Sequence, residues 1–374
     1  GRSKGCHRVA IFEMMGAMKR RLNLLVLAGG RSAERDVSCI SAAFVLRSAD
    51  PKRYRLSAVH IDARGRWTLL DKPMDFARHP KPWKFPFRGR PVSLDLGSGS
   101  WLKAGGRGVA VDAVFPALHG PMGEDGTIQG LLELAGAAYL GCDVMGSAVA
   151  MNKQVSKRLA LEAGLPVLPF RVLNSVKETS SVSGLRYPLF VKPCRFGSSV
   201  GVYKVKRPAD LPAAVRRAFK YDTTVIVEQG IPARELECAL LGDEQRVEAS
   251  IVGEIKPNAE FYDYHAKYLD PNGAELFVPA PIPAATAARL RELAKKAFRV
   301  LGLYGLARLD FMMDRGCGKL YFNEANTLPG FTPGSLYPKL WAQSGLPVPR
   351  LIDRLVSLAL ARQKARAGLR INPL

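Results

Sequence analysis

The chain has 374 residues, more than one ordinary hydrophobic core accommodates, so two or three domains are expected. Hydrophobic residues make up 47% of it and charged residues 24%, the balance of a folded soluble protein, and no apolar run reaches the roughly 18 residues of a membrane span. The formal net charge of +22 would ordinarily suggest nucleic acid or an anionic membrane as a partner; because much of the excess lies in residues 1–21 and in the tail from Arg362, neither is expected as the main partner.

Six cysteines are scattered along the chain without a CxxC pair. This spacing disfavours a zinc site and a disulfide framework, and it favours a reduced, cytoplasmic protein. Residues 1–20 lack the apolar stretch of a signal peptide. The alternatives for them are a tag remnant, a mis-called start and a disordered arm, and we expect a disordered extension.

Residues 21–143 begin with a β–α–β pattern. The apolar run 22–30, closed by two glycines, predicts a buried parallel strand. The next segment has helical spacing with Ser32 as the expected N-cap, and 54–62 predicts a second strand. The pattern indicates a doubly wound α/β domain.

The rest of this domain is less regular in sequence. Residues 71–108 are rich in proline, glycine and basic residues, and we expect irregular structure that could include a hairpin. Residues 111–120 predict another strand and loop, and "GTIQGLLELAG" predicts a helix that ends at Gly136.

Residues 144–229 predict a small α+β unit. A single amphipathic helix is expected over 147–164, followed by the strands "YPLFVKP" and "VGVYKVK". The helix "LPAAVRRAFKY" and the strand "TVIVEQGI" complete an antiparallel unit.

Residues 230–374 predict a second α+β unit. Paired strands are expected in "ELECALLG" and "VEASIVGEI", a long helix over 284–303, and a closing amphipathic helix over 348–365. Between these helices, "GLARLDFMMD" and "KLYFNEAN" predict two strands joined by a glycine-containing turn.

This strand pair carries the strongest chemical signal. Asp310 lies on the first strand, and Glu324 and Asn326 lie on one face of the second by the two-residue period. If the strands pair, these three oxygen donors converge in a set that suits Mg²⁺, and Arg308 adds a cation for developing negative charge. The alternative is a solvated strand face.

The loop "KPCRFGSSVG", residues 192–201, suggests a phosphate site. It joins two strands, so the backbone N–H groups around Gly197 and Ser199 can point at an anion. Lys192 at the strand end adds a charge, and Lys153 on the preceding helix can add another. The alternative is a plain glycine turn.

Four further side chains lie at strand ends or in the loops that follow them: Glu34, His119, Glu228 and, on a loop, Glu235. Glu34 and His119 follow strands of the first domain, at the edge where open α/β sheets bind ligands. A carboxylate such as Glu34 can hold an ammonium group there, whereas His119 could instead be a structural hydrogen-bonding residue. Glu228 and Glu235 flank the junction of the two α+β units, where they could accept hydrogen bonds from a nucleoside. For an edge carboxylate such as Glu228 or Glu235, the alternative is a side chain that is simply exposed.

Taken together, these segments resemble the D-alanine–D-alanine ligases, a family within the ATP-grasp enzymes. The resemblance runs from about Leu22 to Leu360. The matching stretches are "GGRSAERDVS", "FPALHGPMGEDGTIQGLLEL", "GSAVAMNKQVSK", "FVKPCRFGSSVGV", "VEQGIPARELE", "FYDYHAKYLD", "RLDFM" and "NEANTLPGFTPGSLYP".

The resemblance implies an ATP-grasp fold with an N-terminal doubly wound α/β domain that holds the first substrate, and ATP gripped between the two α+β domains. It implies two Mg²⁺ (or Mn²⁺) ions held by Asp310, Glu324 and Asn326. It places Glu228 at the adenine and Glu235 at the ribose. The remaining residues that it assigns to ATP are Lys153, Lys192, Gly197, Ser199 and, lining an adenine slot, Phe261, Met312 and Phe322.

The implied reaction joins two D-alanines through a D-alanyl phosphate. By resemblance, Arg308 and the backbone N–H of Gly330 stabilise the tetrahedral oxyanion, and Glu34 binds the ammonium of the first D-alanine. The residues assigned to substrate carboxylates are His119 for the first D-alanine, and Lys267, Ser335 and the Leu336 amide for the second.

By the same resemblance, Tyr268 and Ser198 link to Glu34 and close a loop over the site. The retained Lys-Tyr pair in "YDYHAKY" favours an amine acceptor over D-lactate. The resemblance also implies a homodimer, and nucleic acid remains an alternative partner only because of the net charge.

Overall fold

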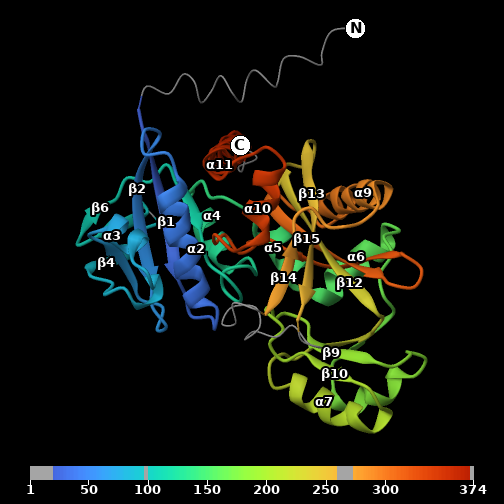
Figure 1. Cartoon of the computed structure of the whole chain (residues 1–374). Coiled ribbons are helices and arrows are strands. Elements are labelled where there is room, and N and C mark those ends of the chain that lie inside the picture. Colours follow the sequence, from blue (N-terminus) through green and yellow to red (C-terminus); the bar gives the residue numbers. More distant parts are fainter. Residues whose placement is uncertain (1–19, 97–99, 259–272, 371–374) are drawn as a thin grey trace.

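The computed structural model describes residues 20–96, 100–258 and 273–370. Three β-sheets follow one another along the chain, and each of the three domains expected from the sequence contains one of them (Figure 1). Of the expected N-terminal extension only Arg20 is described, and its guanidinium lies 2.7 Å from the carboxylate of Asp112. No helix in the described part of the chain combines the length and apolarity needed to cross a membrane.

The first sheet has seven strands in the order β6-β5-β4-β3-β2-β1-β7. These are β1 (Leu22–Gly29), β2 (Tyr54–Ile61), β3 (Trp67–Leu70), β4 (Gly89–Leu94), β5 (Leu102–Ala104), β6 (Arg107–Gly108) and β7 (Ala113–Pro116). β1 pairs in parallel with both β2 and β7, as the β–α–β pattern predicts. The accompanying helices are α2 (Arg35–Ser48), α3 (Pro73–Arg78) and α4 (Thr127–Leu134).

Two expectations for this domain need correction. The segment 71–108 contains α3 and the short strands β4, β5 and β6, so it is more regular than expected. The hairpin that it could include is confirmed, because β5 pairs antiparallel with both β4 and β6. β4 is largely exposed, so it lacks the apolar alternation that signals a strand. Ser32 is not the N-cap of α2, because the helix starts two residues later than expected, after Glu34. The Ser32 hydroxyl accepts from the Glu34 amide (3.2 Å) and donates to the His119 carbonyl (2.7 Å).

The second sheet is antiparallel, in the order β10-β9-β11-β8. Its strands are β8 (Phe170–Leu173), β9 (Leu189–Pro193), β10 (Tyr203–Val205) and β11 (Val225–Gln229), and α7 (Leu211–Ala218) packs against β9 and β10.

The single helix expected over 147–164 is two helices, α5 (Val144–Met151) and α6 (Lys153–Glu162). Asn152 breaks the helix with non-helical backbone angles (φ −86°, ψ 100°). Its side chain accepts from the amides of Gln154 (3.1 Å) and Val155 (3.3 Å) and so caps α6. The hydrophobic period continues through the break, which is why the sequence pattern does not reveal it.

The third sheet is antiparallel, in the order β14-β13-β12-β15-β16. Its strands are β12 (Ala233–Gly242), β13 (Val247–Pro257), β14 (Ala274–Phe277), β15 (Gly305–Asp314) and β16 (Leu320–Asn326). Helix α9 (Ala284–Val300) packs on the sheet in one hydrophobic core. Helices α10 (Leu336–Gln343) and α11 (Val348–Ala367) belong to another core, which also contains α2, β1 and β7.

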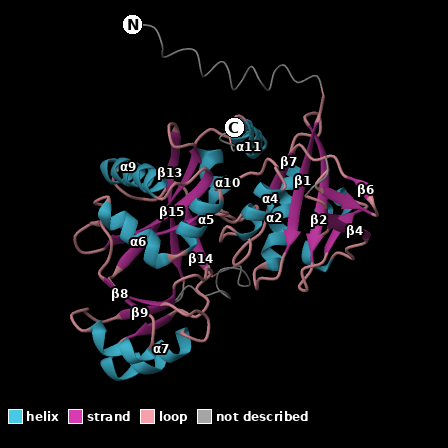
Figure 2. Ribbon diagram, turned by 180° about the vertical axis from the view of Figure 1, so that it is seen from behind, coloured by secondary structure: helices cyan, strands magenta, loops and turns pink. Residues whose placement is uncertain are grey.

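Helix α11 therefore joins the first and third sheets, and both views show it between them (Figures 1 and 2). Its Asp353 is buried and accepts from Arg53 Nη1 (2.5 Å) and the Tyr54 hydroxyl (2.8 Å) of the first domain. Its Arg362 lies over the rings of Tyr139 (4.2 Å) and Tyr304 (4.8 Å). These contacts fix the first domain against the third sheet.

Candidate active site

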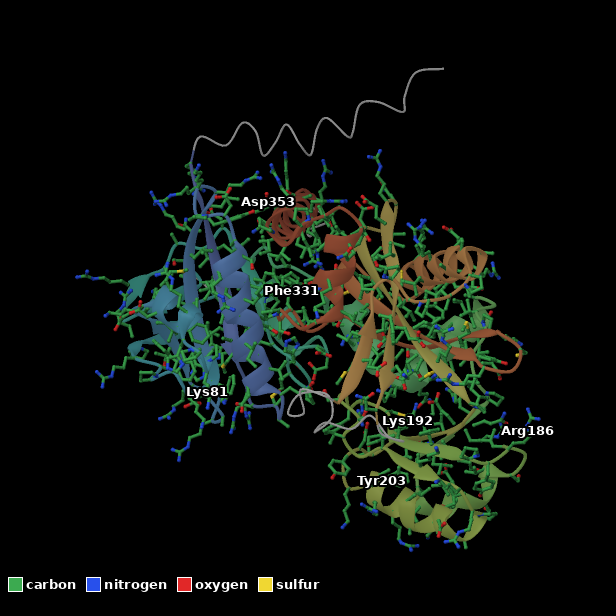
Figure 3. The ribbon with its side chains drawn as sticks, viewed as in Figure 1. Lys81, Arg186, Lys192, Tyr203, Phe331 and Asp353 are labelled. Atoms are coloured by element: carbon green, nitrogen blue, oxygen red, sulfur yellow. The ribbon has the colours of Figure 1, made fainter. Side chains whose placement is uncertain are left out.

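A cavity of about 920 Å³ lies where the three sheets face one another. It is lined by Glu34 and His119 from the first domain, by the loop after β9, and by Arg308 and Asp310 on β15. Figure 3 shows Lys192 at this meeting point, between the second sheet and the strands of the third. A site at a domain junction is typical of small-molecule enzymes.

Strands β15 and β16 pair as the sequence predicts, with Asp310 opposite Glu324 and Arg308 opposite Asn326. Arg308 donates twice to Asp310, with both distances 2.8 Å, and its Nε lies 2.9 Å from Glu237 Oε2. Burial would lower the pKa of Arg308, but the neighbouring carboxylates outweigh it and raise that pKa, so the guanidinium stays charged. Glu237 on β12, opposite Asp310, was not singled out from the sequence.

A β-bulge in this hairpin changes one expectation. Asp310 pairs with Glu324, but the next residue, Phe311, pairs with Phe322, so Asn323 is the extra residue. Phe322 consequently lies fully buried in the core, edge-on to Phe311 with 5.9 Å between the ring centroids. It does not line the cavity, contrary to the expectation that it lines an adenine slot. Asn323 lines the cavity in its place. The three-residue spacing from Phe322 to Ala325 was the sequence signal of this bulge.

The oxygen donors on this hairpin fit a hard divalent cation. Asp310, Glu324 and Asn326 all line the cavity, and the buried Oδ1 of Asn326 has no hydrogen-bond partner. Within the described residues, no three or more His, Cys, Asp or Glu side chains form a metal-binding group, so the candidate set is two carboxylates and one amide. Oxygen-only sets with few protein ligands suit Mg²⁺, which retains water and phosphate in its shell.

The loop between β9 and β10 is held in an unusual conformation. Ser198 (φ 51°) and Ser199 (φ 59°) both have the left-handed backbone that non-glycine residues rarely adopt. Lys153 Nζ donates to the Phe196 carbonyl (2.8 Å) and lies 3.2 Å from Glu324, so it joins this loop to the carboxylate hairpin. Such strain is maintained at functional sites by the surrounding contacts.

Glu228 lies between two lysines. Lys157 Nζ is 2.6 Å from its Oε1, and Lys192 Nζ donates to its Oε2. Burial would raise the pKa of Glu228, but the two ammonium groups outweigh it and lower that pKa to about 2. Lys157 was not singled out from the sequence, because a lysine on the polar side of an amphipathic helix ordinarily faces water.

Glu34 is held at the first-domain edge of the cavity. Ser198 Oγ donates to its Oε1, which is the expected link between the β9–β10 loop and Glu34. Gly120 has a positive φ, and a Cβ there would lie 2.3 Å from Glu34 Oε2, so only glycine leaves room for the carboxylate.

His119 uses both ring nitrogens within the protein. Its Nδ1 donates to the Leu328 carbonyl (3.0 Å), and its Nε2 lies 2.9 Å from the Ser41 hydroxyl. Ser41 in turn accepts from the Phe331 amide (3.3 Å). Burial would lower the pKa of His119, but Glu124, 3.6 Å away, and Glu34 raise it. His119 therefore ties α2 to the loop that carries Gly330, in addition to lining the cavity.

The last group of expected residues lies at the start of α10. Ser335 is the N-cap residue, and its hydroxyl accepts from the Thr332 amide (3.0 Å). A Cβ at Gly330 would lie 2.8 Å from this hydroxyl, so a larger residue there would have to displace the Ser335 side chain. Gly330, Ser335 and Leu336 line the cavity.

Two other expected nucleotide residues, Glu235 and Met312, are paired neighbours on β12 and β15, and both line the cavity. Phe261, Lys267 and Tyr268 lie outside the described residues, as does His265 of the same segment.

A doubly wound domain and two α+β units around one cavity of this kind define the ATP-grasp class. Family models confirm the more specific group: the D-ala D-ala ligase N-terminus model matches residues 23–142 and the C-terminus model residues 159–357. The chain belongs to the D-alanine–D-alanine ligase family.

Similar proteins agree with this assignment. The chain is 47% identical to D-alanine–D-alanine ligase A of Bradyrhizobium diazoefficiens, over 94% of this chain and 98% of that protein. It is 43% identical to D-alanine–D-alanine ligase of Thermoanaerobacter sp. strain X514, over 90% of this chain and 96% of that protein.

Solved structures agree as well. The D-alanine-D-alanine ligase of Coxiella burnetii superposes with a TM-score of 0.83 at 35% identity, covering 93% of this chain and 96% of that one. The VanG D-Ala:D-Ser ligase of Enterococcus faecalis superposes with a TM-score of 0.81 at 33% identity, covering 91% and 100%.

Proposed function

We infer that the protein is an ATP-dependent ligase that joins two D-alanines into D-alanyl-D-alanine, for peptidoglycan precursor synthesis. One observation carries this assignment: the Ser198–Glu34 hydrogen bond connects the loop suited to phosphate with the carboxylate suited to an amino-acid ammonium, inside one cavity. Family membership over nearly the whole chain supports the same reaction.

ATP is proposed to lie between the second and third sheets. Glu228 would accept from the adenine, Glu235 would contact the ribose, and Met312 would pack against the base. Lys153, Lys192 and the backbone of the loop from Gly197 to Ser199 would neutralise the phosphates. Their common exposure to the cavity supports this arrangement.

Asp310, Glu324 and Asn326 are proposed to hold two Mg²⁺ (or Mn²⁺) ions. These ions, when bound, would neutralise charge on the transferring phosphoryl group. The unpartnered Oδ1 of Asn326 supports a cation at this position, because a buried amide oxygen without a partner is otherwise unfavourable.

The chemistry proceeds in two steps. The carboxylate of the first D-alanine, held through its ammonium by Glu34, attacks the γ-phosphorus of ATP and forms D-alanyl phosphate and ADP. The free amine of the second D-alanine then attacks the acyl carbon, the nitrogen gives up a proton, and the bond from that carbon to the phosphate oxygen breaks so that phosphate leaves. Arg308 and the Gly330 N–H would stabilise the oxyanion that forms between these events.

The second D-alanine is proposed to bind at the start of α10. Ser335 and the Leu336 amide would receive its carboxylate, because the first N–H groups of a helix have no intrahelical partners and favour an anion. Lys267 and Tyr268 are proposed to complete this end of the site. We further propose the domain limits 21–143, 144–229 and 230–374, a homodimer and a cytoplasmic location, where ATP is available.

The acceptor assay tests this function. ADP release is measured with ATP, Mg²⁺ and D-alanine alone, and again with D-lactate or D-serine added. We expect full turnover with D-alanine alone and D-alanyl-D-alanine as the product. If turnover requires D-lactate or D-serine, then that compound, and not D-alanine, is the second substrate.

A further inference from the structure

We propose that Lys157 is a positioning residue that keeps Glu228 charged and aligned for the base of the nucleotide, and thereby sets the preference for a purine with a 6-amino group. This inference rests on the proposed placement of ATP. It concerns a residue that does not touch the nucleotide, because Lys157 is not among the residues that line the cavity, whereas Glu228 and Lys192 are.

Lys157 is buried to an unusual degree for a lysine. Its side chain is 2% exposed and that of Glu228 is 3% exposed, with 2.6 Å between Nζ and Oε1. Burying an ammonium group is unfavourable unless it is paired, so a lysine at such a position is held there by its partner.

The two lysines on Glu228 have different surroundings. Lys192 leaves β9 at the start of the phosphate loop and lines the cavity, so the triphosphate of a bound nucleotide competes with Glu228 for its ammonium group. Lys157 lies on α6, outside the cavity lining, so its ammonium group cannot leave Glu228 to contact the phosphates. Once Lys192 turns to the nucleotide, Lys157 is the cation that remains on the carboxylate.

A charged carboxylate at this position discriminates between purines. It accepts a hydrogen bond from the 6-amino group of adenine. The 6-oxo group of hypoxanthine or guanine is itself an acceptor, so the carboxylate repels it and makes no hydrogen bond to it. A buried charge that loses its hydrogen-bond partner on the ligand is strongly unfavourable. The preference therefore depends on Glu228 remaining ionised inside the protein.

The ionisation of Glu228 depends on few groups. Lys157 faces it from α6 and Lys192 from β9, and Lys192 is also influenced by Glu235 and Glu324. Removing Lys157 removes a cation that lowers the pKa of Glu228, so that pKa rises. The variant then protonates Glu228 as the pH falls, and its defect should deepen at low pH and lessen at high pH.

Binding of ATP and ITP, which differ at the 6-position, tests the proposal by calorimetry without D-alanine. In Lys157→Met we expect ATP affinity to fall about tenfold or more and the ATP-to-ITP preference to fall by a similar factor, as expected for a weakened hydrogen bond to a charged group. Lys157→Arg should retain the preference. Arg158→Met, at the exposed next position of the same helix, is the control and should bind as the wild type does.

An unchanged ATP-to-ITP preference in a folded Lys157→Met variant would overturn the proposal. If that variant does not fold, the proposal is tested by comparing Glu228→Gln with the double variant Lys157→Met/Glu228→Gln. The double variant is expected to fold because it buries no unpaired charge. We expect both to show the same reduced preference; a further loss in the double variant would mean that Lys157 acts independently of Glu228. These binding measurements contain no D-alanine, so they test the role of Lys157 independently of ligation. A protein that binds ATP but does not join D-alanines would contradict the proposed function and leave the binding result unchanged.

Discussion

At the scale of single residues, the site depends on buried groups that orient the residues expected to touch substrate. Ser41 is fully buried and connects His119 to the Phe331 amide, next to Gly330. Figure 3 shows Phe331 in the centre of the molecule, and its ring packs edge-on to Phe115 of β7 at 5.3 Å. Ser41 therefore positions both His119 and the loop that carries Gly330, the proposed oxyanion donor.

Replacing Ser41 with alanine should slow ligation by about tenfold or more, because the loss of one buried hydrogen-bond partner costs about 1–3 kcal/mol in alignment. Ser38→Ala is a matched control, since Ser38 is an equally buried serine of α2 that bonds Gly29 and the Ala117 carbonyl. Steady-state kinetics and thermal unfolding of both variants check this. Equal activity losses in the two would show that Ser41 stabilises only the fold.

At the scale of secondary-structure elements, the bulge in β16 separates core residues from site residues. Phe322→Ala should lower the free energy of unfolding by about 3–5 kcal/mol, as large-to-small core substitutions do, and should leave the KM for ATP nearly unchanged. Met312→Ala, on the cavity face of β15, should raise the KM for ATP with a smaller stability loss. Urea unfolding and kinetics distinguish the two, and a reversed pattern would place Phe322 at the nucleotide.

The sequence predicts elements better than it predicts their breaks. Asp310, Glu324 and Asn326 could be brought together from the strand period and one turn, because these depend on local pattern. The split at Asn152 is hidden because the hydrophobic period continues through it, although its side chain makes a local helix cap. The extra residue Asn323 left only the three-residue spacing from Phe322 to Ala325 as a signal, which a simple strand period overlooks. The sequence does not predict the roles of Lys157 and Ser41, because only the tertiary structure buries these two side chains.

At the scale of the whole molecule, α11 joins the first domain to the third sheet. Asp353→Ala should remove its hydrogen bonds from Arg53 and Tyr54 and destabilise the protein by about 1–3 kcal/mol, a range that allows for the partial exposure of Arg53. Calorimetric unfolding measures the loss. We expect the KM for ATP to be unchanged, because the proposed nucleotide site lies between the other two sheets. A raised KM would mean that the first domain helps to shape that site.

The most direct test of the whole account is D-alanyl-D-alanine formation by the wild type and by Arg308→Ala, with ATP, Mg²⁺ and D-alanine. Loss of one oxyanion donor typically costs about 2.7–4 kcal/mol, so the variant should be at least about 100-fold slower. ATP affinity measured in parallel should change far less. A wild type that forms no D-alanyl-D-alanine, or an Arg308→Ala variant that forms it at the wild-type rate, would contradict the account.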